Sequence, residues 1–590
     1  MKKMMILAAV LALVLTLGAV SGACGEEIPS AVELTRLMGN GINLGNTFEA
    51  CNNGARGGRT TDSPAFYETM WGQPVTTREM IHGMKEAGFD SIRIPVAWMT
   101  NATYLGQQGD YTISTAYLDR VEEVVSWALE EGMYVVLNDH WDGGWYGMFG
   151  SESAETRALA MEAYRGMWTQ LARRFEKYDY HLIFEGANEE IGARFDENSP
   201  LYCQDSIDTY LTDAQKYALA NEVNQVFVDT VRAAGGNNAD RFLLIPGYGT
   251  NIERTFDARF VMPKDSARDR LLVSVHCYSP WSYCGATSSA SASKWGIKAD
   301  YAALENEMKM MAKFVGQGYG VIIGEYGVLP GGDNVAKENA AAYHRYFLDL
   351  CDYYDYCPML WDTSCFYNRR TLSFREKDME ALYDERRLSR EEKDYSQVKA
   401  AARASMDAAA GEAPETFRTD LVELTDETVV AWIMWSSGDW ALSYSVGDTY
   451  SPDAISAGIV PTDVVVEGEG TYTVALDFTG TEQGFSNGVA FSALGLANGE
   501  TIHPGWAIHI QEMKINGEPY KLSGRPYTTS DDGKCTRVNL YNEWVTQVPG
   551  DARTLYGPIG IGASPTVINR ADEVISHIET IEVTFIYGPK

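Results

Sequence analysis

The chain has 590 residues, which is long for one domain and would fit a barrel of about 250–400 residues beside a smaller domain. Its hydrophobic fraction of 45% and mean hydropathy of −0.23 are those of a globular protein with a core, not of a disordered chain. The formal net charge of −33 excludes a protein that binds a nucleic-acid backbone, because such binding needs clustered Lys and Arg. The acidity favours solubility, and it is compatible with a neutral substrate.

The N-terminal segment has the pattern of a signal peptide. Two lysines precede an apolar run over Met4–Val20, and three small residues up to Ala23 follow it. We therefore expect residues 1–23 to direct secretion to the cell exterior. The alternative is a membrane anchor, for which the run is short. Cys24 stands where a lipid-modified cysteine could lie, so a cell-surface lipoprotein is a second possibility.

Eight short apolar runs alternate with helix-like stretches. The runs are Gly41–Leu44, Ser91–Ile94, Tyr134–Leu137, Leu182–Phe184, Phe242–Ile245, Leu271–Val275, Val321–Ile323 and Met359–Trp361. The stretches between them include Ala116–Glu131, Glu152–Tyr178, Asp213–Ala234 and Tyr301–Gly316. This alternation predicts parallel strands, and eight repeats predict an α/β (β/α)₈ TIM barrel with its active site at the C-terminal ends of the strands.

Polar and aromatic residues follow nearly every run, at the end where a barrel has its active site. They are Asn43 and Asn46, Arg93, Asn138–Asp142, Glu185–Glu189, His276 and Tyr278, Glu325, and Trp361–Asp362. A random surface would not place such residues so consistently.

Glu189 and Glu325 end the fourth and seventh runs and suit the cleavage of a glycosidic bond. One carboxyl group must be protonated to expel the leaving oxygen, and the other must be ionised. His276 and Tyr278 lie two apart on a strand and face the same side, so with Arg93 they could keep Glu325 ionised as the nucleophile. Glu189 would then be the acid, with a pKa raised by partial burial and by repulsion from Glu325.

Two further residues suit the binding of a sugar. Asn188 could bond the 2-hydroxyl group, and Trp361 could form the floor of the pocket by stacking. A lone Trp is more often a core residue, and a lone Arg is more often a salt-bridge partner.

Seven segments resemble the broad endo-β-1,4-glucanase branch of glycoside hydrolase family five. They are GINLGNTFEA (Gly41–Ala50), ETMWGQPVTT (Glu68–Thr77), SIRIPVAW (Ser91–Trp98), VVLNDHWDGGW (Val135–Trp145), LIFEGANE (Leu182–Glu189), SVHCYSPW (Ser274–Trp281) and VIIGEYG (Val321–Gly327). The resemblance implies a retaining double displacement with Glu189 as acid/base and Glu325 as nucleophile. It implies supporting roles for Arg93, His140, Asn188, His276, Tyr278 and Trp361, and we add Asn46 at the end of the first run. It implies no metal and no cofactor.

The sequence departs from the family pattern at four positions. Trp141 stands where a second His is usual, Glu190 replaces a common Pro, Cys277 lies where an aromatic is frequent, and Thr363 replaces a common Asn. Trp141 and Glu190 follow strands that bear site residues, so they affect the expected substrate preference. Glu190 beside Glu189 could also raise the pKa of the acid.

The pattern changes towards the C-terminus. A charged segment over residues 364–400 predicts a solvated loop or helix, followed by a last barrel helix near Ser396–Ala409. We expect a catalytic domain over 29–410, a linker over 411–416 and an antiparallel β-sandwich over 417–590. Its strands are expected near Thr428–Trp435, Ala441–Val446, Thr471–Asp477, Trp506–Ile510 and Thr580–Tyr587.

The build of this sandwich resembles an appended carbohydrate-binding module, although a purely structural module is also possible. Trp432 lies in an alternating apolar segment and is expected in the core. Trp440 and Trp544 lie in turn-rich segments and are expected to be exposed stacking platforms.

The sequence therefore predicts a secreted, monomeric endo-β-1,4-glucanase that acts on a β-1,4-linked polysaccharide. A xyloglucanase or a β-mannanase on the same site is an alternative, and so is a polysaccharide-binding protein that has lost turnover. A metal-dependent hydrolase using His140 and Asp142 is disfavoured, because no His-x-His pair is present. The nine cysteines show no Cys-x-x-Cys spacing, so a zinc site is not expected, whereas disulfides are possible after export.

Overall fold

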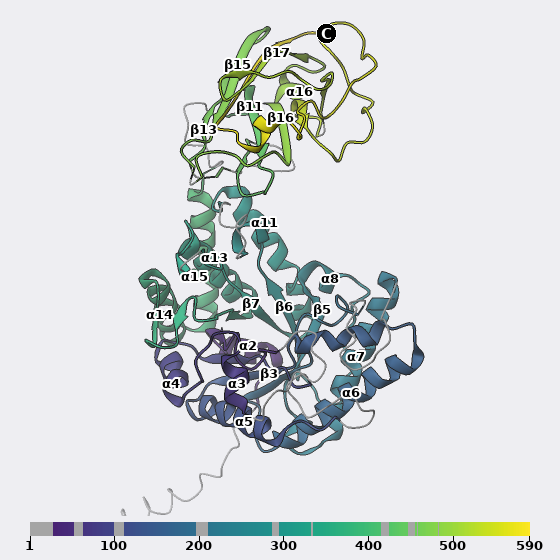
Figure 1. The fold of residues 1–590 in the computed structure, drawn as a ribbon. Helices are drawn as coiled ribbons and strands as arrows, with labels where there is room; N and C mark the ends of the chain where they lie inside the picture. Colours follow the sequence, from purple (N-terminus) through teal and green to yellow (C-terminus); the bar gives the residue numbers. More distant parts are fainter. Residues whose placement is uncertain are drawn as a thin grey trace, which may run out of the picture.

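The structure is a computed structural model that describes residues 28–51, 63–99, 111–195, 211–285, 294–331, 334–414, 424–446, 455–456, 458–481, 483–530 and 532–590. Eight parallel strands form a closed barrel, and two antiparallel sheets follow it (Figure 1). The expected signal segment over 1–23 and Cys24 lie outside the described residues. None of the described helices is both long and apolar enough to cross a lipid bilayer.

The barrel strands follow one another around the ring in chain order, and the last pairs with the first. They are β1 Gly41–Asn43, β2 Ser91–Ile94, β3 Tyr134–Asn138, β4 Leu182–Glu185, β5 Leu243–Asn251, β6 Leu271–Cys277, β7 Gly320–Tyr326 and β8 Tyr356–Leu360. The predicted barrel is confirmed. Strand β8 begins earlier than predicted, because Cys357 and Pro358 are buried in it although they break the apolar pattern.

Helices surround the ring of strands. They are α2 Ala31–Leu37, α3 Pro64–Thr69, α4 Arg78–Glu86, α5 Thr115–Glu130, α6 Ala154–Arg174, α7 Asp213–Ala233, α8 Ile252–Phe256, α9 Trp281–Cys284, α11 Lys298–Lys309, α12 Ala312–Gly316, α13 Ala340–Tyr354, α14 Lys377–Glu392 and α15 Tyr395–Glu412. Helix α7 opens with a capping box in which Thr212 and Gln215 satisfy each other's backbone N–H groups. The predicted stretch Tyr301–Gly316 is divided between α11 and α12.

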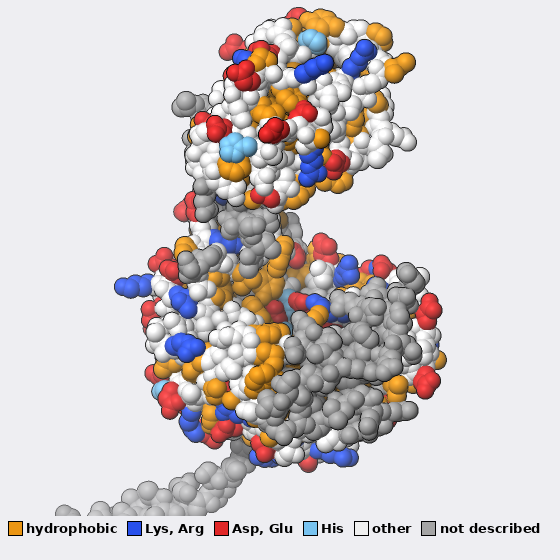
Figure 2. Space-filling view, viewed as in Figure 1, with side chains coloured by type: hydrophobic (Ala, Val, Ile, Leu, Met, Phe, Trp, Pro, Cys, Tyr) orange, Lys and Arg blue, Asp and Glu red, His pale blue; other side chains and the backbone are white. Residues whose placement is uncertain are grey.

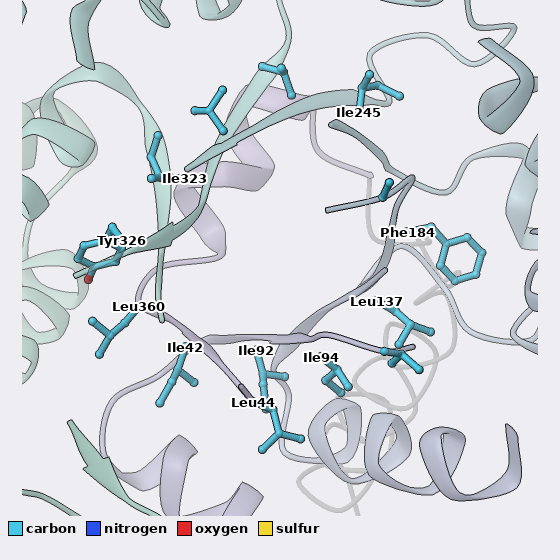
Figure 3. Close-up of a cluster of buried hydrophobic side chains, with 14 of the residues drawn as sticks. Ile42, Leu44, Ile92, Ile94, Leu137, Phe184, Ile245, Ile323, Tyr326 and Leu360 are labelled. Atoms are coloured by element: carbon cyan, nitrogen blue, oxygen red, sulfur yellow. The ribbon is translucent and has the colours of Figure 1, made fainter. Parts of the chain in front are cut away.

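Strand side chains alternate between two cores, as a pleated strand requires. Figure 3 shows Ile42, Ile92, Leu137 and Phe184 among those that point outward to the helices. The intervening residues point inward and pack with α2, which thereby covers the N-terminal end of the barrel. This inner cluster comprises Ala31, Leu34, Met38, Val136, Ile183, Phe242, Leu244, Leu272, Ile322, Cys357 and Met359. The C-terminal ends of the strands are left for polar residues.

The C-terminal domain consists of two antiparallel sheets that share one apolar core. The first contains β11 Val430–Ser436, β12 Ser443–Tyr444, β14 Val464–Val465, β16 Phe491–Ala497, β19 Thr528–Thr529 and β20 Thr536–Tyr541. The second contains β13 Val460–Thr462, β15 Gly470–Asp477, β17 Ala507–Ile515, β18 Glu518–Pro519 and β21 Thr580–Gly588. The predicted sandwich is confirmed, and Trp432 is buried in its core as predicted.

One expectation on chain organisation needs correction. Helix α15 continues to Glu412, so the linker cannot begin at residue 411 as predicted, because the Ala-rich segment extends the helix. Residues 415–416 of that linker lie outside the described part. Disulfides do not link Cys277, Cys284, Cys351, Cys357 and Cys365, which are buried thiols. Cys203 also lies outside the described residues.

The charged segment over 364–400 forms a hairpin of β9 (Tyr367–Asn368) and β10 (Ser373–Phe374), and then helix α14. The expectation of a solvated face is wrong at Arg386, which is buried. Its guanidinium donates to both carboxylate oxygens of Asp352, at 3.0 and 2.8 Å. This buried ion pair fastens α14 to α13.

We predict that Arg386→Ala destabilises the protein by about 3 kcal/mol, because it leaves the Asp352 carboxylate in the interior without its main partner. The neighbouring Arg387→Ala is the matched control, since Arg387 pairs with Glu391 at the surface of the same helix. We expect the control to cost less than about 0.5 kcal/mol. Chemical denaturation measures both, and equal losses would contradict the role given to Arg386.

Candidate active site

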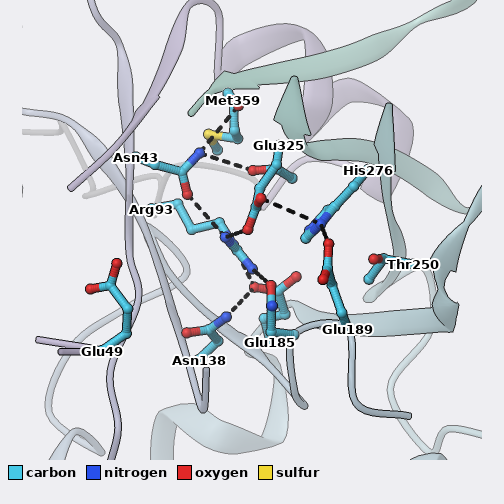
Figure 4. A network of polar contacts seen from close by, with 12 residues as sticks. Asn43, Glu49, Arg93, Asn138, Glu185, Glu189, Thr250, His276, Glu325 and Met359 are labelled. Carbon is cyan, nitrogen blue, oxygen red and sulfur yellow. Dashed lines mark hydrogen bonds and ion pairs between the residues drawn. The ribbon is translucent and has the colours of Figure 1, made fainter. Parts of the chain in front are cut away.

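Glu189 and Glu325 meet at the C-terminal ends of the barrel strands, as the sequence predicted. Glu189 follows β4, Glu325 lies on β7, and His276 lies on β6 between them. An oxygen of each carboxylate and a nitrogen of His276 all lie within 4.8 Å of one another (Figure 4). Retaining glycosidases place their two carboxyl groups about 5–5.5 Å apart, so this spacing suits a double displacement.

Arg93 on β2 connects the groups around this pair. It is fully buried, and its Nη1 donates to Glu325 Oε1 at 3.1 Å. Its Nε donates to Glu185 Oε2 at 2.7 Å, and its Nη2 donates to Asn188 Oδ1 at 2.8 Å. The side-chain oxygen of Asn43 also accepts from Nη1, at 3.0 Å. Arg93 thus joins strands β1, β2, β4 and β7 at one point.

Glu325 is held from two further sides. The Tyr278 hydroxyl donates to Glu325 Oε2 at 3.0 Å, and His276 Nδ1 lies 3.6 Å from the same oxygen. Burial raises the pKa of Glu325, whereas the charges of His276 and Arg93 offset part of this rise. The predicted contacts of Arg93, His276 and Tyr278 with Glu325 are therefore present.

Glu189 is more accessible, with 38% of its side chain exposed. Its Oε1 lies 2.9 Å from His276 Nδ1, and its Oε2 lies 3.9 Å from Arg194 Nη2. Burial raises the pKa of Glu189, but the bond with His276 and the charge of Arg194 outweigh burial, so this pKa lies below its usual value. The predicted rise in the pKa of Glu189 is therefore wrong.

The pKa of His276 moves in the opposite direction to that of Glu189. Burial lowers the pKa of His276, but the carboxylates of Glu325 and Glu189 raise it by more, so the balance lies above the usual value. The two carboxylates therefore favour the protonated form of the His276 imidazole. The repulsion between the two carboxylates, on which the predicted rise depended, is screened by this positive charge.

His140 and Trp361 form a stacked pair at the ends of β3 and β8. Their ring centroids lie 5.7 Å apart and their planes differ by 13°. Burial and the positive charge of Arg93 hold the pKa of His140 well below its usual range, so the imidazole is neutral. Trp361 is partly exposed, which agrees with a place beside a substrate.

Strand β1 contributes Asn43 to the site. Asn43 enters the polar network, and its amide also donates to the backbone carbonyls of Gly324 and Met359. Asn46 lies in the following turn, where its backbone N–H donates to Glu49. The side chain of Asn43 therefore belongs to the polar network at the end of β1, whereas the supporting role expected for Asn46 stays a prediction.

The sequence reasoning named Glu185 and Asn138 only as residues at strand ends. Both belong to the network, since Asn138 donates to Glu185 Oε2 at 3.0 Å. The sequence signal that could have assigned them to the site is a polar residue at the last position of an apolar strand. Arg194 was missed, because it lies in a segment without a periodic pattern.

The distances among Glu189, His276 and Glu325 would also suit a small cation. However, Arg93 and Tyr278 already occupy the two oxygens of Glu325. Asp142, the residue that could favour a metal site, accepts from the Met99 backbone N–H at 2.6 Å. The donor set therefore fits acid–base chemistry better than metal binding.

The barrel and its paired carboxylates define a glycoside hydrolase, and comparison with known proteins specifies the family. Residues 54–365 match the family model "Cellulase (glycosyl hydrolase family 5)". Endoglucanase A of Paenibacillus barcinonensis is 36% identical over 360 residues, which cover 56% of this chain and 82% of that protein. The chain belongs to glycoside hydrolase family 5.

Two other relatives extend the comparison. The xyloglucan-specific endo-beta-1,4-glucanase BoGH5A of Bacteroides ovatus is 34% identical over 308 residues, covering 50% of this chain and 57% of that protein. The structure of a family 5 lichenase mutant from Caldicellulosiruptor sp. F32 with cellotetraose is 31% identical. It has a TM-score of 0.52 and covers 61% of this chain and 96% of that chain.

We predict that Tyr278→Phe shifts the acidic limb of the pH dependence of kcat/KM upward by about one unit and lowers kcat/KM by roughly 10-fold or more. The variant removes a donor to the ionised form of Glu325, so the pKa of Glu325 rises further. Tyr343→Phe is the control, because its hydroxyl donates to the Ser279 carbonyl at 2.8 Å. An unmoved acidic limb in Tyr278→Phe would contradict this assignment.

Proposed function

We propose that this protein is an endo-acting hydrolase of β-1,4-linked plant cell-wall glucans that retains the anomeric configuration. The observation that carries the proposal is the close approach of Glu189 and Glu325 across one barrel mouth. Similar proteins bear the names endoglucanase and xyloglucan-specific endo-beta-1,4-glucanase. A neutral polymer also suits a chain with a net charge of −33, whose acidic side chains are scattered over both domains (Figure 2).

In the first step the Glu325 carboxylate attacks the anomeric carbon while protonated Glu189 donates its proton to the glycosidic oxygen. The C–O bond breaks, the shortened chain leaves as an alcohol, and the sugar is bonded to Glu325. In the second step Glu189 takes a proton from water as the water oxygen attacks the same carbon. Glu325 is then released as a carboxylate, and Glu189 is protonated again.

Each carboxyl group has an environment that suits its part in this cycle. Arg93 and Tyr278 hold both oxygens of Glu325, which favours the carboxylate and orients it. Glu189 can exchange a proton with His276, because His276 Nδ1 lies 2.9 Å from Glu189 Oε1. We propose that proton transfer along this contact gives the acid form of Glu189 when substrate enters and displaces water.

We predict that Glu325→Gln abolishes measurable turnover, because no group remains to form the bond with the sugar. Glu189→Gln is expected to lose turnover on polysaccharide but to retain the first step on aryl glycosides whose leaving group needs no proton. A burst of aryl alcohol measures that step. If both variants behave alike on activated substrates, the division of roles is wrong.

The preferred polymer is tested by initial rates on carboxymethylcellulose, barley glucan, xyloglucan and glucomannan. The proposal expects internal cleavage of the first two, with β-configured ends in the first products seen by proton NMR. Faster cleavage of xyloglucan or glucomannan would favour the alternative specificities. Absence of cleavage on every polymer would favour a polysaccharide-binding protein without turnover.

We also propose that the C-terminal domain binds β-glucan. Trp440 and Trp544 are 49% and 61% exposed, and their ring centroids lie 5.9 Å apart. Phe491, at the start of β16, lies 6.1 Å from Trp544. Trp440 has φ of +61°, which a bulky residue rarely adopts and which is often found at functional positions. Such rings suit stacking against the C–H faces of sugars.

We predict that Trp440→Ala or Trp544→Ala, each in an inactive Glu325→Gln chain, weakens the retention of the full chain by barley glucan about 10-fold in native gels. Tyr556→Ala is the matched control, since Tyr556 is 61% exposed in the same domain. Equal retention of all these chains would contradict the proposal and favour a structural module.

Secretion remains a proposal based on residues 1–23, together with the alternative of lipid attachment at Cys24. Mass spectrometry of the mature chain distinguishes the two, because lipidation adds mass to the residue that becomes the N-terminus. The monomeric state is likewise a proposal, which light scattering tests.

A further inference from the structure

The two carboxylate oxygens of Glu189 face two different cationic side chains. His276 contacts Oε1 from β6, and Arg194 approaches Oε2 from the turn that follows β4. Arg194 Nη2 lies 3.9 Å from Glu189 Oε2, and 27% of the Arg194 side chain is exposed. It is therefore a charge interaction without a hydrogen bond, and it acts on the oxygen that His276 leaves open.

The turn that bears Arg194 is firmly anchored. Ile191 and Phe195, on either side of it, are fully buried. Gly192 packs so closely on the ring of Tyr248 that an added Cβ atom would lie 2.6 Å from that ring. Because these contacts fix the backbone of the turn, the Cα atom of Arg194 has a defined position near Glu189.

The outer end of Arg194 is held by an aromatic ring. Its guanidinium carbon lies 4.3 Å from the centroid of the Trp141 ring, a cation–π contact. Trp141 has φ of +57°, in the left-handed region that bulky residues rarely adopt. A strained backbone of this kind persists only when its surroundings hold it.

Glu190 supplies that support. It is fully buried, and its Oε1 accepts from the Trp141 backbone N–H at 2.7 Å. Its Oε2 accepts from the Asn188 backbone N–H at 2.9 Å. Glu190 therefore ties the loop after β3 to the loop after β4. Trp141 and Glu190 are two of the positions at which the chain departs from the family pattern, and they bond each other. Arg194 packs on the Trp141 ring and so belongs to the same cluster.

We propose that Arg194 is a positioning residue which, held by Trp141 and Glu190, sets how readily Glu189 holds its catalytic proton. This inference rests on the proposed role of Glu189 as acid/base. A positive charge beside Oε2 favours the carboxylate, so Arg194 opposes the acid step and assists the base step. The other titratable and charged groups that face Glu189 are His276, Arg93, Glu325, Tyr278 and its neighbour Glu190. Of these, only Glu190 lies on the same segment as Arg194.

The test is the pH dependence of kcat/KM on a soluble β-glucan, since kcat/KM includes the step in which Glu189 donates its proton. In Arg194→Gln the alkaline limb should move upward by about 0.5–1 pH unit, because loss of the positive charge raises the pKa of Glu189. Arg194→Lys should restore much of the wild-type profile. Trp141→Ala should shift the limb in the same direction, and adding it to Arg194→Gln should shift the limb no further.

Arg259→Gln is the matched control. Arg259 lies 4.3 Å over the ring of Tyr217, as Arg194 does over Trp141, but it pairs with Asp257. Its profile should equal that of the wild type. An unmoved alkaline limb in an active Arg194→Gln enzyme overturns this inference while the proposed function stands. Absence of β-glucan cleavage by the wild type would instead refute the proposed function.

Discussion

The buried guanidinium of Arg93 is the interaction on which the site depends. An arginine without solvent contact is tolerated only when each of its three nitrogens has a hydrogen-bond partner and its charge is balanced. Arg93 meets this condition through Glu185, Glu325, Asn188 and Asn43, which come from three other barrel strands or the turns after them. These bonds, which offset the cost of burying Arg93, also fix the position of Glu325, the proposed nucleophile, and of the turn that bears Glu189.

Three basic side chains surround the two carboxylates of the site. His276 lies near both carboxylates, while Arg93 serves Glu325 and Arg194 serves Glu189. These positive charges favour the carboxylate form of both groups, although Glu189 must be protonated for the first step of the proposed mechanism. The entry of a neutral sugar, which excludes water, is the event that can shift the proton from His276 to Glu189.

Much of this arrangement could be predicted, because strand periodicity and barrel geometry place the residues that end the strands at one mouth. Glu189, Glu325, Arg93, His276 and Tyr278 were found in this way. The bond between Asn43 and Arg93 depends on side-chain direction at a strand end, which a motif does not specify. Arg194 lies in an aperiodic turn, and the pKa of Glu189 depends on distances to His276 and Arg194. Neither can be obtained from the order of residues alone.

Covalent trapping tests the central claim most directly. Incubation of the protein with an activated 2-deoxy-2-fluoro-cellobioside should accumulate the glycosyl-enzyme, because the fluorine slows both its formation and its hydrolysis, whereas the activated leaving group speeds its formation alone. Peptide mass mapping should then place one added 2-deoxy-2-fluoro-cellobiosyl group on Glu325. A label on Glu189 or any other residue, or turnover with inversion and no label, would contradict the account.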